Sequence, residues 1–268
     1  MRCILFPLFA AGLLTLISTF HASAEPPPGL DRFMAAAKRF GELQKVAQAK
    51  NTMPRLAEPE VADLLATLSD ANSLFGTTTY NRGDMPAMLQ VCNQGTQIMS
   101  DYSLSGLTGA LDKSDSKDVM TRKVFALQAQ NIATFQAEMI PIMAFSLRCQ
   151  ARLSQLMADF VSHLPPSEWT DTRREGLQTV RRGMAGGVSA GLMMLGATDG
   201  SLKPQFEAQM ASALADTAPS IADMLPVAQR QSILAQAEKI TPPTELKPAL
   251  ERIIAAMSRT DCEGLCQR

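Results

Sequence analysis

The sequence has few of the side chains that catalytic and metal sites depend on. Among its 268 residues there are only two histidines, His21 and His163. A Ser-His-Asp triad needs a histidine beside its nucleophile, and zinc sites gather several histidines or cysteines. His21 lies in a segment that we expect to be removed. His163 falls at the end of an expected helix, where a positive charge is favourable. We therefore expect no catalytic set, no metal site and no cofactor.

Aromatic residues and strand-like patterns are also scarce. The chain has one tryptophan, two tyrosines and eleven phenylalanines, and it lacks alternating β-branched runs. Alanine, leucine, glutamine and methionine take their place, and these residues favour helices. The composition predicts an all-α fold, a helical bundle of about six to eight helices.

Neither sign of charge is in excess. Lys and Arg number 25 and Asp and Glu number 26, and no long run of like charge occurs. Such a balance gives no long-range attraction to nucleic acid or to an anionic lipid surface. We therefore expect no nucleic-acid partner.

The first 24 residues have the pattern of an export signal. Met1-Arg2 is followed by an uncharged, mostly apolar run from Cys3 to Phe20, and Ala22 and Ala24 form the small-residue pattern of a cleavage site. Three prolines follow, and prolines cannot continue a helix. An uncleaved N-terminal anchor is the alternative. We expect removal of residues 1–24, a periplasmic or secreted protein without a transmembrane span, and a single all-helical domain over residues 25–268.

Prolines and glycines divide the remaining chain into expected helices. One helix is much longer than the others, because its apolar residues stay on one face from Val124 to Phe160. Pro141 lies inside it, so we expect a kink near Pro141 rather than a break. Ser167 is a good N-cap for the helix that follows. The expected helices cover residues 30–49, 59–74, 84–103, 117–163, 167–196, 202–216, 220–238 and 244–258.

Four cysteines remain after removal of the signal: Cys92, Cys149, Cys262 and Cys266. An even number in an exported chain predicts two disulfides, with three pairings open. The local pairing joins Cys262 to Cys266 and leaves Cys92 for Cys149. Redox or metal chemistry is the alternative, but C-x-x-x-C is not the thioredoxin-like spacing.

Geometry complicates the bond between Cys92 and Cys149. In a simple antiparallel hairpin Cys92 faces Ala129, which places Cys149 about 30 Å away at 1.5 Å per residue. A disulfide requires Cα atoms within about 7 Å. The long helix must therefore fold back at Pro141, or the 105–116 loop must carry the chain along. If neither happens, Cys262 and Cys266 must form the disulfides with Cys92 and Cys149.

Three further features are candidate sites. Glu138 is the only charged residue between Val124 and Leu147, so it is a candidate buried acid, although it can equally lie on the polar face. Gly183, Gly187 and Gly191 recur every four residues, which predicts a close helix contact within the domain or across a dimer. Methionine pairs such as Met85 and Met88 or Met139 and Met143 suit Cu(I), but methionine also fills helical cores, which we favour.

These observations lead to three hypotheses about function. The first is an exported, non-enzymatic protein that acts through protein–protein contacts in the cell envelope, with an envelope protein or with itself. The second is a binding module for a small apolar or lipid ligand between Met- and Leu-lined helices. The third is a hydrolase or lyase that uses a carboxylate such as Glu138.

Overall fold

The computed structural model describes residues 29–76, 79–112, 114–197, 202–262 and 265–267. The expected signal peptide, residues 1–24, lies outside the described residues. The described chain is helical and contains no strand, which confirms the all-α prediction. Eight of its helices have eleven residues or more: α1 (Leu30–Gln48), α2 (Pro59–Ser69), α4 (Met85–Ser103), α6 (Lys117–Ser162), α7 (Asp171–Leu195), α8 (Pro204–Ala222), α9 (Val227–Ala237) and α10 (Lys247–Ser258).

Shorter helices connect these elements. Two are α-helical, and the others are single 3-10 turns before α4, α7 and α10 and at the C-terminus. They are α3 (Ala71–Phe75), α5 (Leu107–Ala110), η2 (Arg82–Asp84), η3 (Pro166–Glu168), η4 (Thr244–Leu246) and η5 (Leu265–Gln267).

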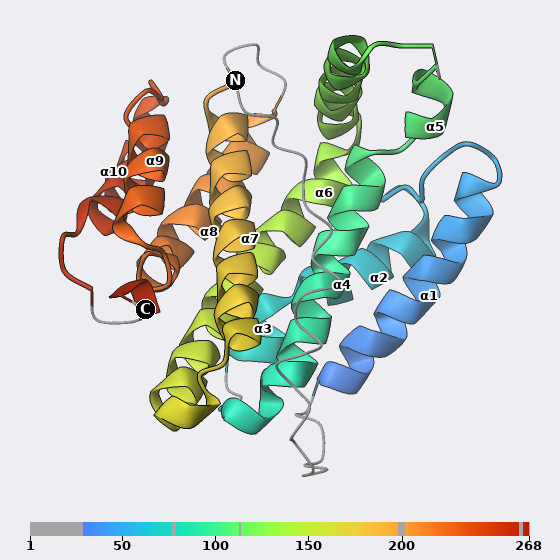
Figure 1. Ribbon diagram of the computed structural model, residues 1–268. Helices are drawn as coiled ribbons and strands as arrows, with labels where there is room; N and C mark the ends of the chain where they lie inside the picture. Colours follow the sequence, from blue (N-terminus) through green and yellow to red (C-terminus); the bar gives the residue numbers. More distant parts are fainter. Residues whose placement is uncertain (1–28, 77–78, 113, 198–201, 263–264, 268) are drawn as a thin grey trace.

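The long helix α6 runs through the middle of the molecule. It has 46 residues, about 70 Å at 1.5 Å per residue. It packs against α4 and α2 on one side and against α8 on the other. In Figure 1 the N-terminal helices α1 and α2 and the C-terminal helices α9 and α10 lie on opposite sides of this central part. The buried apolar side chains of all these helices form one contiguous cluster.

The expected kink in α6 is present. The one residue with a non-helical backbone is Phe135 (φ −111°, ψ 19°), which precedes Pro141 in the same helix. Proline lacks the N–H that would bond the carbonyl four residues earlier, and its ring crowds that carbonyl. The helix accommodates this strain upstream of Pro141 and then continues to Ser162.

Three expected boundaries are wrong. The helix expected over residues 59–74 breaks at Asp70, whose carboxylate accepts a bond from Ser73 N (3.0 Å) and caps α3. Ser167 is not the N-cap of α7, because it lies in η3, and Thr170 caps that helix instead. Helix α8 continues through Pro219 to Ala222, so the break that we expected after residue 216 lies before Pro226. Burial of the helix end beyond Pro219 offsets the lost backbone bond.

The methionines singled out in the sequence are core residues. Met85, Met88, Met139 and Met143 are each buried among apolar side chains of α4 and α6. Their flexible side chains fill the space between the helices, as methionine commonly does.

Candidate functional site

Glu138 is buried just beyond the kink of α6, with 2% of its side chain exposed. Its Oε1 atom accepts a hydrogen bond from Leu56 N (2.9 Å) and lies 3.1 Å from Arg55 Nε. Arg55 also donates to the carbonyl of Thr134 (3.2 Å), and its guanidinium lies 4.8 Å from the centre of the Phe135 ring. The buried acid therefore ties the segment before α2 to the kinked turn of α6.

Tyr102 completes this arrangement from the end of α4. Its hydroxyl donates to the carbonyl of Pro54 (2.7 Å), and its ring centre lies 5.3 Å from that of Phe135. Burial raises the pKa of the Tyr102 hydroxyl, and the nearby charge of Glu138 raises it further. The hydroxyl is therefore a neutral donor to the backbone. The contacts of Glu138 Oε1 are made to residues 55 and 56 of the chain itself, which points to a structural role for this acid, whereas Oε2 is buried without a hydrogen-bond partner in the described chain.

Cys92 and Cys149 lie at disulfide distance, with Cα atoms 5.5 Å apart. Helix α6 does not fold back at Pro141. Instead, the loop carries the chain along, because Asn131 of α6 donates to the carbonyls of Ser103 (3.0 Å) and Ser105 (2.9 Å) at the end of α4. The first turns of α6 therefore extend beyond α4, and the simple hairpin that set Cys92 opposite Ala129 is wrong.

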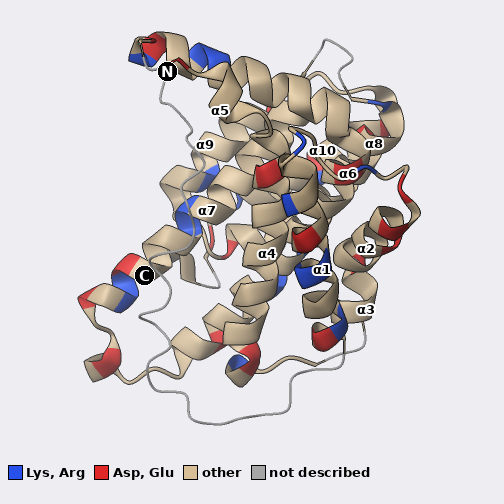
Figure 2. Cartoon of the chain, turned by 90° about the vertical axis from the view of Figure 1, so that its right-hand side faces the viewer, with Lys and Arg blue, Asp and Glu red and all other residues tan. Residues whose placement is uncertain are grey.

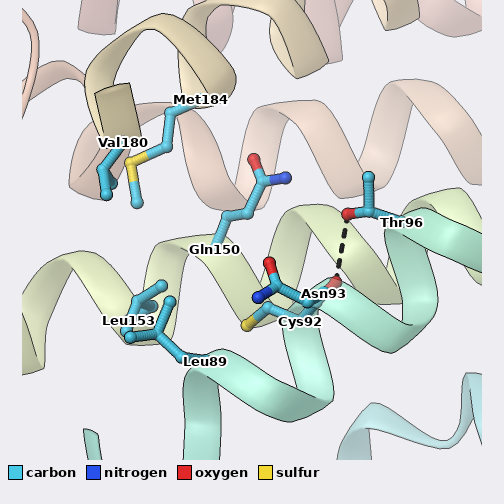
Figure 3. A pocket seen from close by; sticks show the side chains of 8 residues that line it. All are labelled: Leu89, Cys92, Asn93, Thr96, Gln150, Leu153, Val180 and Met184. Atoms are coloured by element: carbon cyan, nitrogen blue, oxygen red, sulfur yellow. Dashed lines mark hydrogen bonds between the residues drawn. The ribbon is translucent and has the colours of Figure 1, made fainter. Parts of the chain in front are cut away.

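A small cavity lies beside this cysteine pair, between α4, α6 and α7 (Figure 3). Its volume is about 20 Å³, enough for about one water molecule. Gln150 Oε1 on its wall is buried and has no hydrogen-bond partner in the described chain. The cavity is too small for a lipid, so it does not support the hypothesis of an apolar ligand. Its lining comprises Leu89, Cys92, Asn93, Thr96, Gln150, Leu153, Val180 and Met184.

Cys262 and Cys266 also lie at disulfide distance, with Cα atoms 5.8 Å apart.

Two buried arginines that we did not anticipate hold this end of the chain. Arg181 of α7 donates to the carbonyls of Met224 (2.8 Å) and Leu265, and Arg230 of α9 donates to the carbonyl of Arg259 (2.6 Å). The sequence did indicate that Arg181 is buried, because it lies one turn from Leu177 on the apolar face of its helix.

The glycines of α7 lie where this helix meets its neighbours. Gly183 and Gly191 are buried. A Cβ at Gly191 would lie 2.9 Å from Leu214 Cδ1 of α8, and one at Gly187 would lie 3.3 Å from Gln150 Oε1 of α6. The close contacts of Gly187 and Gly191 are therefore made within this chain.

The part of the chain that projects beyond α4 differs from the rest. None of the described residues between positions 104 and 130 is buried; we refer to this segment, which contains α5 and the first turns of α6, as the projection. Figure 1 shows it beyond the end of α4, with α5 beside the start of α6. Lys123 pairs with Asp115 (2.6 Å), and this bond lowers the pKa of the Asp115 carboxyl. The loop with α5 is thus held to the first turns of α6 by polar contacts and a few half-buried apolar side chains.

Phe125 is the large apolar side chain that the projection exposes most, with 43% of its surface exposed. Ala126 and Ala129 beside it are also exposed, and α6 carries no charge from Val124 to Ala137. An uncharged strip of this kind, with an exposed aromatic ring and small side chains, is suited to contact with another surface.

The described residues give little support to histidine chemistry, a metal site or a surface of one charge. His163 is exposed and lies 3.3 Å from Asp159. Within the described chain His, Cys, Asp and Glu side chains do not gather in groups of three or more at which a metal ion could bind. Figure 2 shows basic and acidic residues interspersed over the described helices.

Among the described helices, not one combines the length and apolar character that a membrane span requires. No protein-family model, curated protein or solved structure matches the chain.

Proposed function

We propose that the protein is exported to the periplasm or beyond, and that it acts without catalysis, through contact between the projection and another protein of the cell envelope. The observation that carries this proposal is the projection itself. It holds Phe125 exposed on a helix that has no charged side chain over residues 124–137. Because the projection lies outside the core, its ordered structure buries little apolar surface of the chain itself.

The chemistry of the projection indicates the kind of partner. Because the exposed side chains of α6 from Phe125 to Thr134 carry no charge, a partner that covers this part presents a weakly charged surface rather than an acidic or basic one. An exposed aromatic ring next to small side chains is a typical anchor of such contacts.

Export is supported by the pattern of residues 1–24 and by the two cysteine pairs at disulfide distance. Mass spectrometry of the protein isolated from its native cells tests this part. We expect a chain that begins at Glu25 and contains no free thiol. A chain that retains residues 1–24 and remains in the cytoplasm would contradict export.

Site-specific photo-crosslinking in the intact envelope tests the contact. A photoreactive phenylalanine analogue at position 125 should give one discrete adduct with another protein. The same analogue at position 227 is the matched control, because Val227 on α9 is exposed to a similar degree (47%). We expect the adduct at position 125 only, and its loss when Ala129 is also replaced by Glu.

Two results would overturn the proposal. Equal adducts at positions 125 and 227 would mean that the projection is not a specific contact. An adduct formed only between two copies of this chain, together with a dimer in sedimentation analysis, would replace the envelope partner by self-association. Ala129→Glu should change the free energy of unfolding by no more than about 0.5 kcal/mol, because its site is exposed.

A further inference from the structure

A polar groove lies between α3, α6 and α8, away from the projection. Its volume is about 280 Å³, near the lower end of the range for small-molecule sites, about 300 Å³. Figure 1 locates the three helices that form it. Both polar and apolar side chains line it, among them Asn72, Phe75, Arg148, Arg152, Asp216 and Ser220.

Arg148 provides positive charge that the chain neutralises only weakly. It makes no hydrogen bond to a described residue, and its nearest carboxylate oxygen, on Asp216, is 3.7 Å away. The same carboxylate is engaged more closely by Arg252 (3.1 Å) and also accepts a bond from Ser212 (3.3 Å). Asp216 is the one acid among the residues that line the groove, whereas two arginines, Arg148 and Arg152, line it.

Arg152 lies one turn further along α6, on the same face as Arg148. Its Nη1 atom donates to Gln155 Oε1 (2.8 Å), and its guanidinium lies 5.7 Å from the centre of the Tyr80 ring. These contacts orient the guanidinium. Its Nε atom is buried and has no acceptor in the described chain, which leaves part of its hydrogen-bonding capacity unused.

Apolar side chains of α3 and α6 also line the groove. Ala71, Phe75 and Ala151 contribute to its lining. The ring of Phe75 stacks on that of Phe145 (centres 5.7 Å apart) and meets the edge of the Tyr80 ring (6.3 Å). Phe75 is therefore fixed in place as a rigid apolar wall beside the two arginines.

We propose that this groove binds a small organic carboxylate, with the carboxylate between Arg148 and Arg152 and an apolar body against Phe75. Guanidinium groups bind carboxylates with paired hydrogen bonds, and two of them one turn apart can hold one anion. The apolar wall favours a ligand that carries a ring or short aliphatic chain over a bare inorganic anion. This site is independent of the contact proposed for the projection.

Isothermal titration of the purified, disulfide-bonded chain with three probes tests the proposal. Benzoate has both charge and an apolar body, inorganic phosphate has charge alone, and benzyl alcohol has the body alone. We expect benzoate to bind at least tenfold more tightly than either of the others, and more weakly as salt increases. In amide NMR spectra the shifts should centre on Asn72, Gly76, Ala151 and Thr217.

Variants locate the binding. Arg148→Gln and Arg152→Gln should each weaken benzoate binding at least tenfold, whereas Arg122→Gln, on the exposed side of the same helix, should leave it unchanged. Ser220→Glu covers the case in which an arginine variant fails to fold, because it adds a competing carboxylate and should abolish binding. Absence of benzoate binding at millimolar concentration, shifts elsewhere on the surface, or equal binding by the arginine variants would overturn the proposal. Phosphate binding as tight as that of benzoate would overturn the role of Phe75.

Discussion

Four charged side chains are buried among the described residues, namely Asp84, Glu138, Arg181 and Arg230, and each makes a hydrogen bond to backbone. Glu138 accepts from Leu56, Arg181 donates to Met224 and Leu265, and Arg230 donates to Arg259. Burial lowers the pKa of Arg181, because the charged form loses its hydration. Burying such a group is costly unless hydrogen bonds replace the water that it loses. Glu138 and the two arginines therefore act as ties between segments that are distant in sequence.

The glycines of α7 give the first prediction at this scale. Gly191→Ala should lower the free energy of unfolding by about 1 to 2 kcal/mol, because the new methyl group meets Leu214 at 2.9 Å and overpacks the contact. Gly186→Ala is the matched control on the same helix, since a Cβ there meets no atom within 4 Å. It should raise stability by about 0.5 to 1 kcal/mol through better helix propensity. Urea denaturation measures both; equal gains would show that the contact with Leu214 is loose.

At the scale of helices, the relation between α4 and α6 decides which residues meet. Gly106 adopts a positive φ of 80° just before α5, a conformation that glycine adopts readily. The loop then leads the chain beyond the end of α4 before α6 begins. Asn131, rather than the start of α6, lies at that end, and Cys149 is thereby brought to Cys92.

The two cysteine pairs should therefore contribute unequally to stability. Loop-closure entropy predicts a loss of about 4 kcal/mol when the pair separated by 57 residues is replaced by alanines, and about 2 kcal/mol for the pair separated by four. Urea denaturation of the two double variants measures the difference. Peptide mapping without reductant should recover Cys92 with Cys149 and Cys262 with Cys266. Peptides that join Cys149 to Cys262 would contradict this pairing.

The helices could be predicted more accurately than the candidate sites. Spacing and composition predict the long helix and its kink. They leave the observed pairing of the cysteines as one of three alternatives. The placement of Glu138 could not be predicted, because its partner Arg55 lies far away in sequence and both exposed and buried positions fit the local pattern. The projection could not be predicted either, since Met120, Val124 and Leu127 have the spacing of core residues although the described chain buries them only in part.

At the scale of the whole molecule, α6 links the N-terminal and C-terminal helices. It packs against α2, α4, α7 and α8, so separate unfolding of either half would expose part of its apolar surface. We therefore expect one cooperative unfolding transition, consistent with a single domain. Far-UV circular dichroism and the fluorescence of Trp169 should change at the same urea concentration. Two separated transitions with the disulfides intact would show that residues 25–268 contain two independent units.

The sequence by itself determined that this protein is helical, where most helices begin and end, and that its long helix is kinked. These properties depend on residues a few positions apart, which the chain displays directly. Only the tertiary structure decided the register of α4 against α6, the burial of Glu138, Arg181 and Arg230, and the exposure of Phe125 on the projection. These depend on the path of a loop and on contacts between distant segments, for which neighbouring residues carry no local pattern.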